Sequence, residues 1–324
     1  MAENGIQVKN GKAFEFALAS EFANHFRNFG AIHIIEDQEF ATCKRDFDSQ
    51  APAAQHAFIQ ASRLPIDTLQ RIEPGLSHPR DQDDKLYVRF LPDSAGRKGD
   101  VRDVVFYRKK NDRMIWEIGL SAKNNHEAVK HPRISPSIDF GRDWALGTNC
   151  SDSYIKAVRE VFDWVKSEKE LGKSNWKDLG PLKIDKVYRP LKDAFKEELA
   201  RLGVLENMPS RLIHYLIGVK PFYKVIKHDR YNVVTVKAFN FITGLNLTYN
   251  GVKPEYKPDI TPMPTRVVDI SDKDGSQDTV TMIMDKGWQV DFRFHNAETK
   301  LANSVKLDVQ LKGNPPVLFT QYLF

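Results

Sequence analysis

Residues 99–123 read GDVRDVVFYRKKNDRMIWEIGLSAK and contain two runs rich in β-branched, aromatic and alternating side chains. The first run covers residues 101–108 and the second covers residues 114–123. The polar KKND stretch at 109–112 joins them and has the composition of a tight turn. The sequence therefore predicts a β-hairpin here.

The second run of this hairpin has one polar and one apolar side. Because successive side chains of a strand point to opposite faces, Ser121 and Lys123 share one face, while Leu120 and Ala122 share the other. Asp103 stands in the first run. An aspartate and a lysine on neighbouring strands suit a metal-dependent nuclease, in which the carboxylate holds Mg²⁺ and the ammonium lies near the attacking water and the phosphate oxygens.

Two aspartates precede the buried part of the first run, and they cannot both face one metal. Asp103 directly precedes the apolar residues 104–106, whereas Asp100 follows Gly99 and belongs to the turn. A separation of three residues puts the two carboxylates on opposite sides of a regular strand, so the sequence favours Asp103. From the residues alone, an exposed aspartate and a lysine lying along an amphipathic hairpin is the ordinary alternative.

Helical and β patterns surround the hairpin. Residues 11–29 carry apolar side chains at spacings of three and four, which predicts an amphipathic helix, and a short strand follows at 31–35. A second helical pattern covers residues 52–69. The stretch at 73–84 has the composition of a surface loop.

The C-terminal third changes in character. Ser151 is a good N-cap for one helix, and a second helix begins at Pro190 and ends before Gly203. Beyond residue 219, alternating β-branched and aromatic residues predict a mainly β region. We therefore expect two parts, 1–218 and 219–324.

Composition excludes several classes of protein. With 324 residues, 41% of them hydrophobic and 28% charged, the chain can bury a sizeable core, so disorder of the whole chain is excluded. The two cysteines, Cys43 and Cys150, cannot form a disulfide framework or a Cys-x-x-Cys metal site, so we expect a reducing compartment, the cytoplasm. No secretory signal is visible, and no apolar stretch reaches the roughly 20 residues of a membrane helix, so we expect no membrane partner.

Charge and phosphate motifs narrow the ligand class only a little. A net charge of +5 permits a polyanionic partner without identifying one. The sequence lacks both G-x-x-x-x-G-K-[ST] and G-x-G-x-x-G, so dependence on ATP or NAD is not expected.

Four separate blocks carry a resemblance to a known family. They are NGKAFEFAL, the hairpin GDVRDVVF with WEIGLSAKNNHEAVKHPRIS, then SIDFGRDWALGTNCSDSYIKAVREVF, and FRFHNAETKLANSVKLDVQLKGNPPVLF. The chain resembles the PD-(D/E)XK nucleases, in particular the HaeIII-like type II restriction endonucleases. The resemblance implies an α/β (α+β) fold: a nuclease core with a central mixed sheet flanked by helices, and a β-rich C-terminal part that recognises DNA.

The resemblance also implies catalytic residues. The family's aspartate falls on Asp103, and its acid-x-lysine motif falls on residues 121–123, where serine stands at the acid position. A glutamate from another element would then complete the site, either Glu15 on the first helix or Glu127 just after the strand. The ordinary alternative is an exposed helix carboxylate for Glu15 and a solvated charge beside the basic cluster for Glu127. Glu117 shares the lysine's face but stands four residues before Ser121, about 13 Å away along an extended strand, which is too far for the same metal unless the strand bends.

A basic cluster follows the hairpin directly. Lys130 and Arg133 can contact phosphates, while Asn125, His131 and Arg133 can read base edges in a groove. A solvated basic loop is the alternative, but the family resemblance favours DNA.

A second set of candidate DNA contacts lies in the block FRFHNA. These candidates are Arg293, His295 and Asn296, with Gln310 as a weaker one. Strand alternation puts Arg293 and His295 opposite the two phenylalanines, and arginine to guanine is the commonest specific base contact. The alternative is a surface Arg293 paired with Asp291 or Glu298.

Together these observations predict a Mg²⁺-dependent type II restriction endonuclease that cleaves double-stranded DNA. By resemblance, its target would be GGCC, and its functional partner a cognate DNA methyltransferase that protects the same site; a homodimer is one arrangement that would suit it. The alternatives are a DNA-binding protein on a degenerated nuclease scaffold and a repair or nicking nuclease of the same fold.

Overall fold

The structure, a computed structural model, describes residues 2–125, 127, 129–296 and 298–324. The described chain is a mixed α/β protein that divides into two compact units. The hairpin unit comprises Ala2–Glu127, Val219–Thr261 and Val317–Phe324, and the second unit comprises Ala128–Gly218 and Pro262–Pro316.

The hairpin unit contains a seven-stranded sheet in the order β1-β2-β3-β4-β6-β7-β12. Its strands are β1 (Ile32–Ile34), β2 (Leu86–Phe90), β3 (Val104–Lys110), β4 (Arg113–Asn124), β6 (Phe222–His228), β7 (Val233–Phe239) and β12 (Thr320–Leu323). Two neighbouring pairs, β1 with β2 and β4 with β6, run parallel, and the others are antiparallel. The predicted mixed sheet is confirmed.

The predicted hairpin is β3 and β4, and its turn chemistry explains why it forms. Lys110 pairs with Arg113, so Asn111 and Asp112 alone make the turn. Both turn residues have positive φ, 50° and 57°. Asparagine and aspartate tolerate this left-handed region better than other side chains, and two such residues in sequence make the turn that best matches the strand twist.

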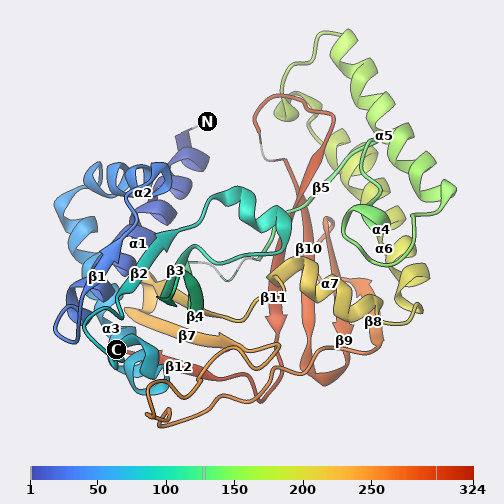
Figure 1. Ribbon diagram of the computed structural model, residues 1–324. Helices are drawn as coiled ribbons and strands as arrows, with labels where there is room; N and C mark the ends of the chain where they lie inside the picture. The colour runs from blue at the N-terminus through green and yellow to red at the C-terminus, as the bar shows by residue number, and fades with distance from the viewer. Residues whose placement is uncertain (1, 126, 128, 297) are drawn as a thin grey trace. The chain divides into compact units, whose positions relative to one another are not determined.

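Three helices, α1 (Ala2–Phe26), α2 (Gln38–Asp48) and α3 (Pro52–Ile72), complete this unit (Figure 1). The apolar stripe predicted for residues 11–29 is confirmed up to Phe26, because Phe14, Leu18 and Phe22 are fully buried, but the helix ends at Phe26 and Phe29 is exposed. The Phe22 ring lies 5.5 Å from that of Phe106 on β3. Helix α1 therefore packs on the apolar face of the hairpin.

The surface loop expected at 73–84 is wrong for its first part. Residues 73–77 are buried and include a short 3-10 turn, Pro74–Leu76. The buried guanidinium of Arg108 on β3 donates to the carbonyls of Gly75 at 2.5 Å, Leu76 at 3.1 Å and Asp84 at 2.5 Å. The side chain of a strand residue thus supplies hydrogen bonds to main-chain carbonyls of this buried stretch.

The second unit contains a five-stranded antiparallel sheet in the order β5-β11-β10-β9-β8. Its elements are β5 (Arg133–Ile134), α4 (Phe140–Asp143), α5 (Asp152–Glu170), α6 (Arg189–Gly203), α7 (Met208–Ile217), β8 (Val267–Asp272), β9 (Thr279–Met284), β10 (Gln289–His295) and β11 (Val305–Gly313). The helix predicted after Ser151 is confirmed, since the Ser151 hydroxyl accepts from the Tyr154 amide at 3.2 Å. Short 3-10 or π turns elsewhere in the chain are Asp93–Lys98, Trp176–Leu179, Ile184–Tyr188, Asp229–Tyr231 and Asp285–Gly287.

The two units do not follow the single boundary expected after residue 218. Strands β6 and β7, expected in the C-terminal part, join the sheet of the hairpin because β6 pairs directly with β4. Helices α4 to α7, expected in the N-terminal part, belong to the second unit. None of the described helices is long and apolar enough to cross a membrane.

Candidate active site and DNA-reading residues

Asp103 and Lys123 lie together at the ends of the hairpin strands. Asp103 extends the ladder just before β3, since its amide donates to the Leu120 carbonyl at 2.8 Å. Its Oδ2 atom accepts from Lys123 Nζ at 3.0 Å, from Ser121 Oγ at 3.1 Å and from the Ala122 amide at 2.8 Å. Three donors therefore hold this carboxylate in one orientation.

The other oxygen of Asp103, Oδ1, receives no hydrogen bond from the residues that the structure describes. The side chains of Asp103 and Lys123 are 17% and 23% exposed, so water reaches both groups. A fixed carboxylate with one oxygen left to bind a hard cation, next to an ammonium, is the chemistry that phosphodiester hydrolysis needs.

Asp100 and Glu117 lie in a different set of ion pairs. Arg102 contacts Asp100 at 2.7 Å and Glu117 at 3.2 Å, and Lys220 approaches both carboxylates at 3.5 and 3.9 Å. Burial alone would raise the pKa of Asp100, but the bonds and charges of Arg102 and Lys220 lower it overall. Both oxygens of each of these two acids thus face a cation, whereas Asp103 has its cation, Lys123, at Oδ2 only.

Glu15 on α1 is a buried acid within the electrostatic reach of Asp103. Its Oε2 atom accepts from Lys12 Nζ at 3.0 Å and from the Cys43 thiol at 3.6 Å. Burial, and then the negative charge of Asp103, raise the pKa of Glu15 above its ordinary value, against the opposing charges of Lys12 and Lys123. Two carboxylates that repel each other in this way favour a cation beside them.

Glu127 follows β4 and is held by two lysines. Lys237 Nζ contacts its Oε2 atom at 2.6 Å, and Lys224 Nζ donates to its main-chain carbonyl at 2.9 Å. The strand register puts Ser121, Lys224 and Lys237 in one row across β4, β6 and β7. Burial, followed by the charge of Lys123, lowers the pKa of Lys224 to about 7.

Sequence reasoning missed these two lysines. The signal was present, because Lys224 and Lys237 each interrupt an apolar run, in FYKVIK and in VVTVKAF. A lysine at an inner position of such a strand is buried only with a partner, and Glu127 is that partner.

The donor set of the hairpin unit fits a hard cation. Asp103, Glu15 and Glu127 offer the carboxylate oxygens that Mg²⁺ prefers, and each of them also pairs with a lysine, Lys123, Lys12 and Lys237 respectively. No compact group of three or more His, Cys, Asp and Glu side chains suited to a metal occurs within the described ranges.

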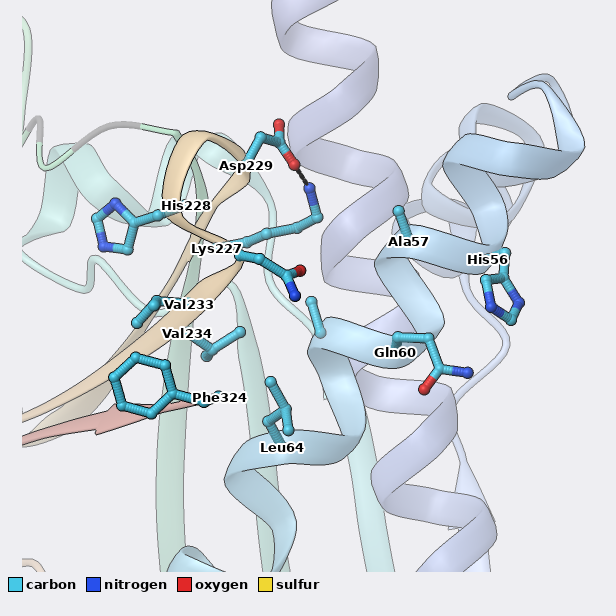
Figure 2. A pocket seen from close by; sticks show the side chains of 12 residues that line it. His56, Ala57, Gln60, Leu64, Lys227, His228, Asp229, Val233, Val234 and Phe324 are labelled. Atoms are coloured by element: carbon cyan, nitrogen blue, oxygen red, sulfur yellow. Dashed lines mark ion pairs between the residues drawn. The ribbon is translucent and has the colours of Figure 1, made fainter.

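The hairpin unit also contains a hollow of about 520 Å³ beside α3, β6 and β7 (Figure 2). Figure 2 shows Lys227 reaching toward Asp229, with which it forms an ion pair, while Leu64 and Phe324 supply apolar lining. None of the predicted site residues lines this hollow, so the candidate site is the Asp103 and Lys123 pair.

The residues of the basic cluster predicted after the hairpin are divided between the two units. Asn125, in the hairpin unit, bonds Asp229 through its side-chain amide and accepts from the Asp229 main-chain amide at 2.7 Å. Lys130, in the second unit, places its ammonium 3.8 Å from the centre of the Tyr215 ring. Asn125 thus stabilises a turn, and Lys130 is partly covered by an aromatic ring.

His131 and Arg133 also lie in the second unit. His131 Nδ1 is 3.4 Å from an Asp308 oxygen, and burial together with Lys306 lowers the pKa of His131, so the ring is neutral at pH 7. Arg133 lies 3.3 Å from Glu298 at an exposed position.

Arg293 has the orientation that strand alternation predicts. Its side chain is 54% exposed, while the two neighbouring phenylalanines are fully buried. It contacts Asp308 at 2.9 Å, rather than either acid considered from the sequence. Asn296 accepts from the Tyr188 hydroxyl at 3.0 Å, and burial lowers the pKa of His295.

Comparison with known proteins places the chain in a family. The sequence model of the HaeIII restriction endonuclease family matches residues 11–315. The chain is 30% identical over 311 residues to the type II restriction enzyme HaeIII of Haemophilus aegyptius, and the match covers 95% of each chain. No solved structure matches it. The resemblance predicted from the four sequence blocks is therefore confirmed, and the chain belongs to the HaeIII family of restriction endonucleases.

Proposed function

We propose that the protein is a Mg²⁺-dependent type II restriction endonuclease of the PD-(D/E)XK fold that hydrolyses double-stranded DNA at GGCC. The observation that carries the proposal is the contact between Asp103 and Lys123 at the ends of paired strands in a chain of this family. The mixed sheet and the helix packed on its hairpin support the fold.

In this mechanism Asp103 and Glu15 hold the cation. When bound, Mg²⁺ supplies Lewis acidity toward a phosphate oxygen. Lys123, kept in place by Asp103 Oδ2, orients the attacking water and stabilises the charge that develops on the phosphorus oxygens. Ser121, at the position of the missing acid, donates to Asp103 and so orients the carboxylate instead of binding metal.

Both glutamates already pair with a lysine, Glu15 with Lys12 and Glu127 with Lys237. We choose Glu15 as the second acid because the negative charge of Asp103 acts on it. We therefore expect Glu15→Gln to reduce cleavage far more than Glu127→Gln. An amide at 127 can still accept from Lys237, whereas an amide at 15 is a poor ligand for a hard cation. The opposite order would move the second metal ligand to Glu127.

The two units suggest a division of labour. The hairpin unit carries Asp103, Lys123, Glu15 and Glu127, so we assign cleavage to it, and we assign base reading to the second unit. A methyltransferase that modifies the same site would protect the host DNA, and two copies of the chain would cut the two strands of a palindrome.

Digestion of supercoiled plasmid with Mg²⁺, followed by sequencing of the ends, tests the proposal. We expect fragments that end at GGCC, and none in EDTA or with Lys123→Ala. Lys44→Ala is the matched control, since it removes an exposed lysine that pairs with Asp48 elsewhere in the same unit.

Other outcomes of this digestion identify the alternatives. Specific binding of DNA without cleavage would mean a degenerated nuclease scaffold, which the serine at position 121 makes a defined alternative. Nicked circles without linear product would mean a nicking or repair nuclease.

A further inference from the structure

The five-stranded sheet of the second unit has one apolar and one polar face. On the apolar side, Phe292 and Phe294 of β10 contact Phe195 of α6, with ring centres 5.3 and 5.7 Å apart. Strand alternation turns the intervening polar residues to the other side. Their cross-strand neighbours are Asp291 with Gln310 and Thr281, Arg293 with Asp308 and Thr279, and His295 with Lys306, which pairs with Arg133.

Asp308 is the centre of this polar face. Its Oδ2 atom accepts from Arg293 Nη2 at 2.9 Å, and its Oδ1 atom accepts from Gln310 Nε2 at 2.9 Å. His131 Nδ1 lies 3.4 Å from Oδ1, is buried, and has no hydrogen-bond partner in the described parts of the chain. With its side chain only 18% exposed, Asp308 is an anchor for Arg293, whose side chain is 54% exposed.

These contacts determine which hydrogen-bonding groups remain for a ligand. Arg293 uses one terminal nitrogen on Asp308, so its other N–H groups point elsewhere as donors. Gln310 must turn its NH₂ group to the carboxylate, which leaves its amide oxygen as an acceptor. The face therefore presents a donor and an acceptor side by side on neighbouring strands.

The charge of this face suits a polyanion. Lysines and arginines slightly exceed acids on it: Arg133, Arg293, Lys306, Lys312 and Lys273 lie around two central acids, Asp291 and Asp308, with Asp269 on the edge strand β8 and Glu298 beside Arg133. Both central acids already have a cation, since Lys273 Nζ contacts Asp291 at 2.7 Å. A hollow of about 260 Å³ lies on the face beside Arg293, Asp308 and Gln310.

We propose that this polar sheet face docks in the major groove of DNA, where Asp308 is the positioning residue that holds Arg293 and Gln310 to read G·C base pairs. The inference rests on the proposed function and names the surface that recognises the substrate. In the major groove guanine offers two acceptors, O6 and N7, and cytosine offers one donor, its 4-amino group. The donors of Arg293 and the acceptor of Gln310 complement that pattern, and the surrounding lysines meet the phosphates.

The test compares Asp308→Asn with wild type in binding assays without divalent metal. The probes are a short duplex with one GGCC site and duplexes changed at one base pair. An asparagine keeps the size of Asp308 but holds Arg293 and Gln310 less firmly, so we expect the preference for GGCC to fall by about tenfold to a hundredfold. Affinity for the altered duplexes should stay the same. Asp163→Asn, at an exposed position of helix α5 in the same unit, is the matched control and should keep the wild-type preference.

A change in the DNA makes the test independent of the folding of the variant. In a further set of duplexes, one cytosine of the site at a time is replaced by a base that lacks the 4-amino group. Wild type should bind at least one of these duplexes more weakly than the unmodified GGCC duplex. Gln310→Ala should bind that duplex and the unmodified one equally well. Equal binding of all these duplexes by wild type would overturn the role of Gln310 as an acceptor.

The remaining outcomes separate this inference from the proposed function. If wild type cuts and prefers GGCC while Asp308→Asn behaves the same, only the inference is wrong. Equal loss of affinity on every duplex would reduce Asp308 to a structural residue and overturn it as well. If wild type neither cuts DNA nor prefers any duplex, the proposed function fails and the inference fails with it.

Discussion

Glu73 is a fully buried carboxyl group in the hairpin unit, and its substitution tests how burial controls titration in this fold. Its Oε1 atom accepts from the Tyr223 hydroxyl at 2.6 Å and from the Asn246 amide at 2.8 Å. Its Oε2 atom has no partner within the part of the chain that the structure describes. Burial raises the pKa of Glu73 to about 8, although the bonds from Tyr223 and Asn246 oppose the shift.

The raised pKa makes stability depend on pH. In the unfolded chain Glu73 loses its proton near its ordinary pKa of 4.5, while the folded protein keeps it up to about pH 8. Between these values the folded state binds the extra proton, so the stabilisation is complete below pH 4.5 and is lost as pH rises. The slope is about 1.4 kcal/mol per pH unit, which makes about 3 kcal/mol between pH 5 and pH 7.

Glu73→Gln should remove this slope, because an amide of the same shape does not titrate. We expect the unfolding free energy of wild type minus that of the variant to fall by about 1.4 kcal/mol for each pH unit from pH 5 to pH 7. Urea denaturation at three pH values measures it. All other groups titrate in both proteins, so the difference isolates Glu73.

The control for this experiment is Glu36→Gln, which makes the same change at an exposed position. Its stability should run parallel to wild type across the same range. A parallel curve for Glu73→Gln would show that Glu73 is ionised in the folded protein, and the argument from burial would then be wrong.

Three further outcomes concern DNA. Asp103→Asn should abolish Mg²⁺-supported cleavage because an amide is a poor ligand for a hard cation. Asp100→Asn should reduce cleavage less, because Asp100 already pairs with Arg102. The rate of plasmid cleavage measures both effects, and the reverse order would contradict the proposed site. Lys130→Ala should lower the slope of log affinity against log salt by about one, and an unchanged slope would remove Lys130 from the phosphate contacts. Arg293→Ala should cost about 1 to 3 kcal/mol of discrimination in competition between GGCC and altered duplexes, while equal loss on every duplex would make it a phosphate contact.

The hairpin and its aspartate–lysine pair could be predicted from the sequence because all the information is local. Alternation identifies the two strands, and Asn111 and Asp112 supply the turn that sets their register. The two-residue turn brings Asp103 to the same end of the hairpin as Lys123, with which it forms an ion pair. An irregularity of the ladder between Arg108 and Lys109 shifts the pairing by one residue, and the sequence did not predict it.

The lysines next to the site could not be predicted in the same way. Lys224 lies beside Ser121 because β6 pairs with β4 in parallel, after a long excursion of the chain through the second unit. No local pattern encodes which distant strand occupies that edge of the hairpin. The same cause explains the single boundary expected after residue 218, since a change in composition does not reveal that the chain returns to an earlier sheet.

Glu15 shows why an acid supplied by another element is harder still to identify. In the helix pattern it occupies a polar position, for which an exposed carboxylate is the ordinary interpretation. Packing of α1 buries the group beside Lys12 and Cys43, and only then does the charge of Asp103 act on it. What distinguishes Glu15 from the other helix glutamates is this shared electrostatic field and not its spacing. The proposed second acid is therefore identified by the charge of Asp103 acting on a buried carboxyl group and not by a sequence motif.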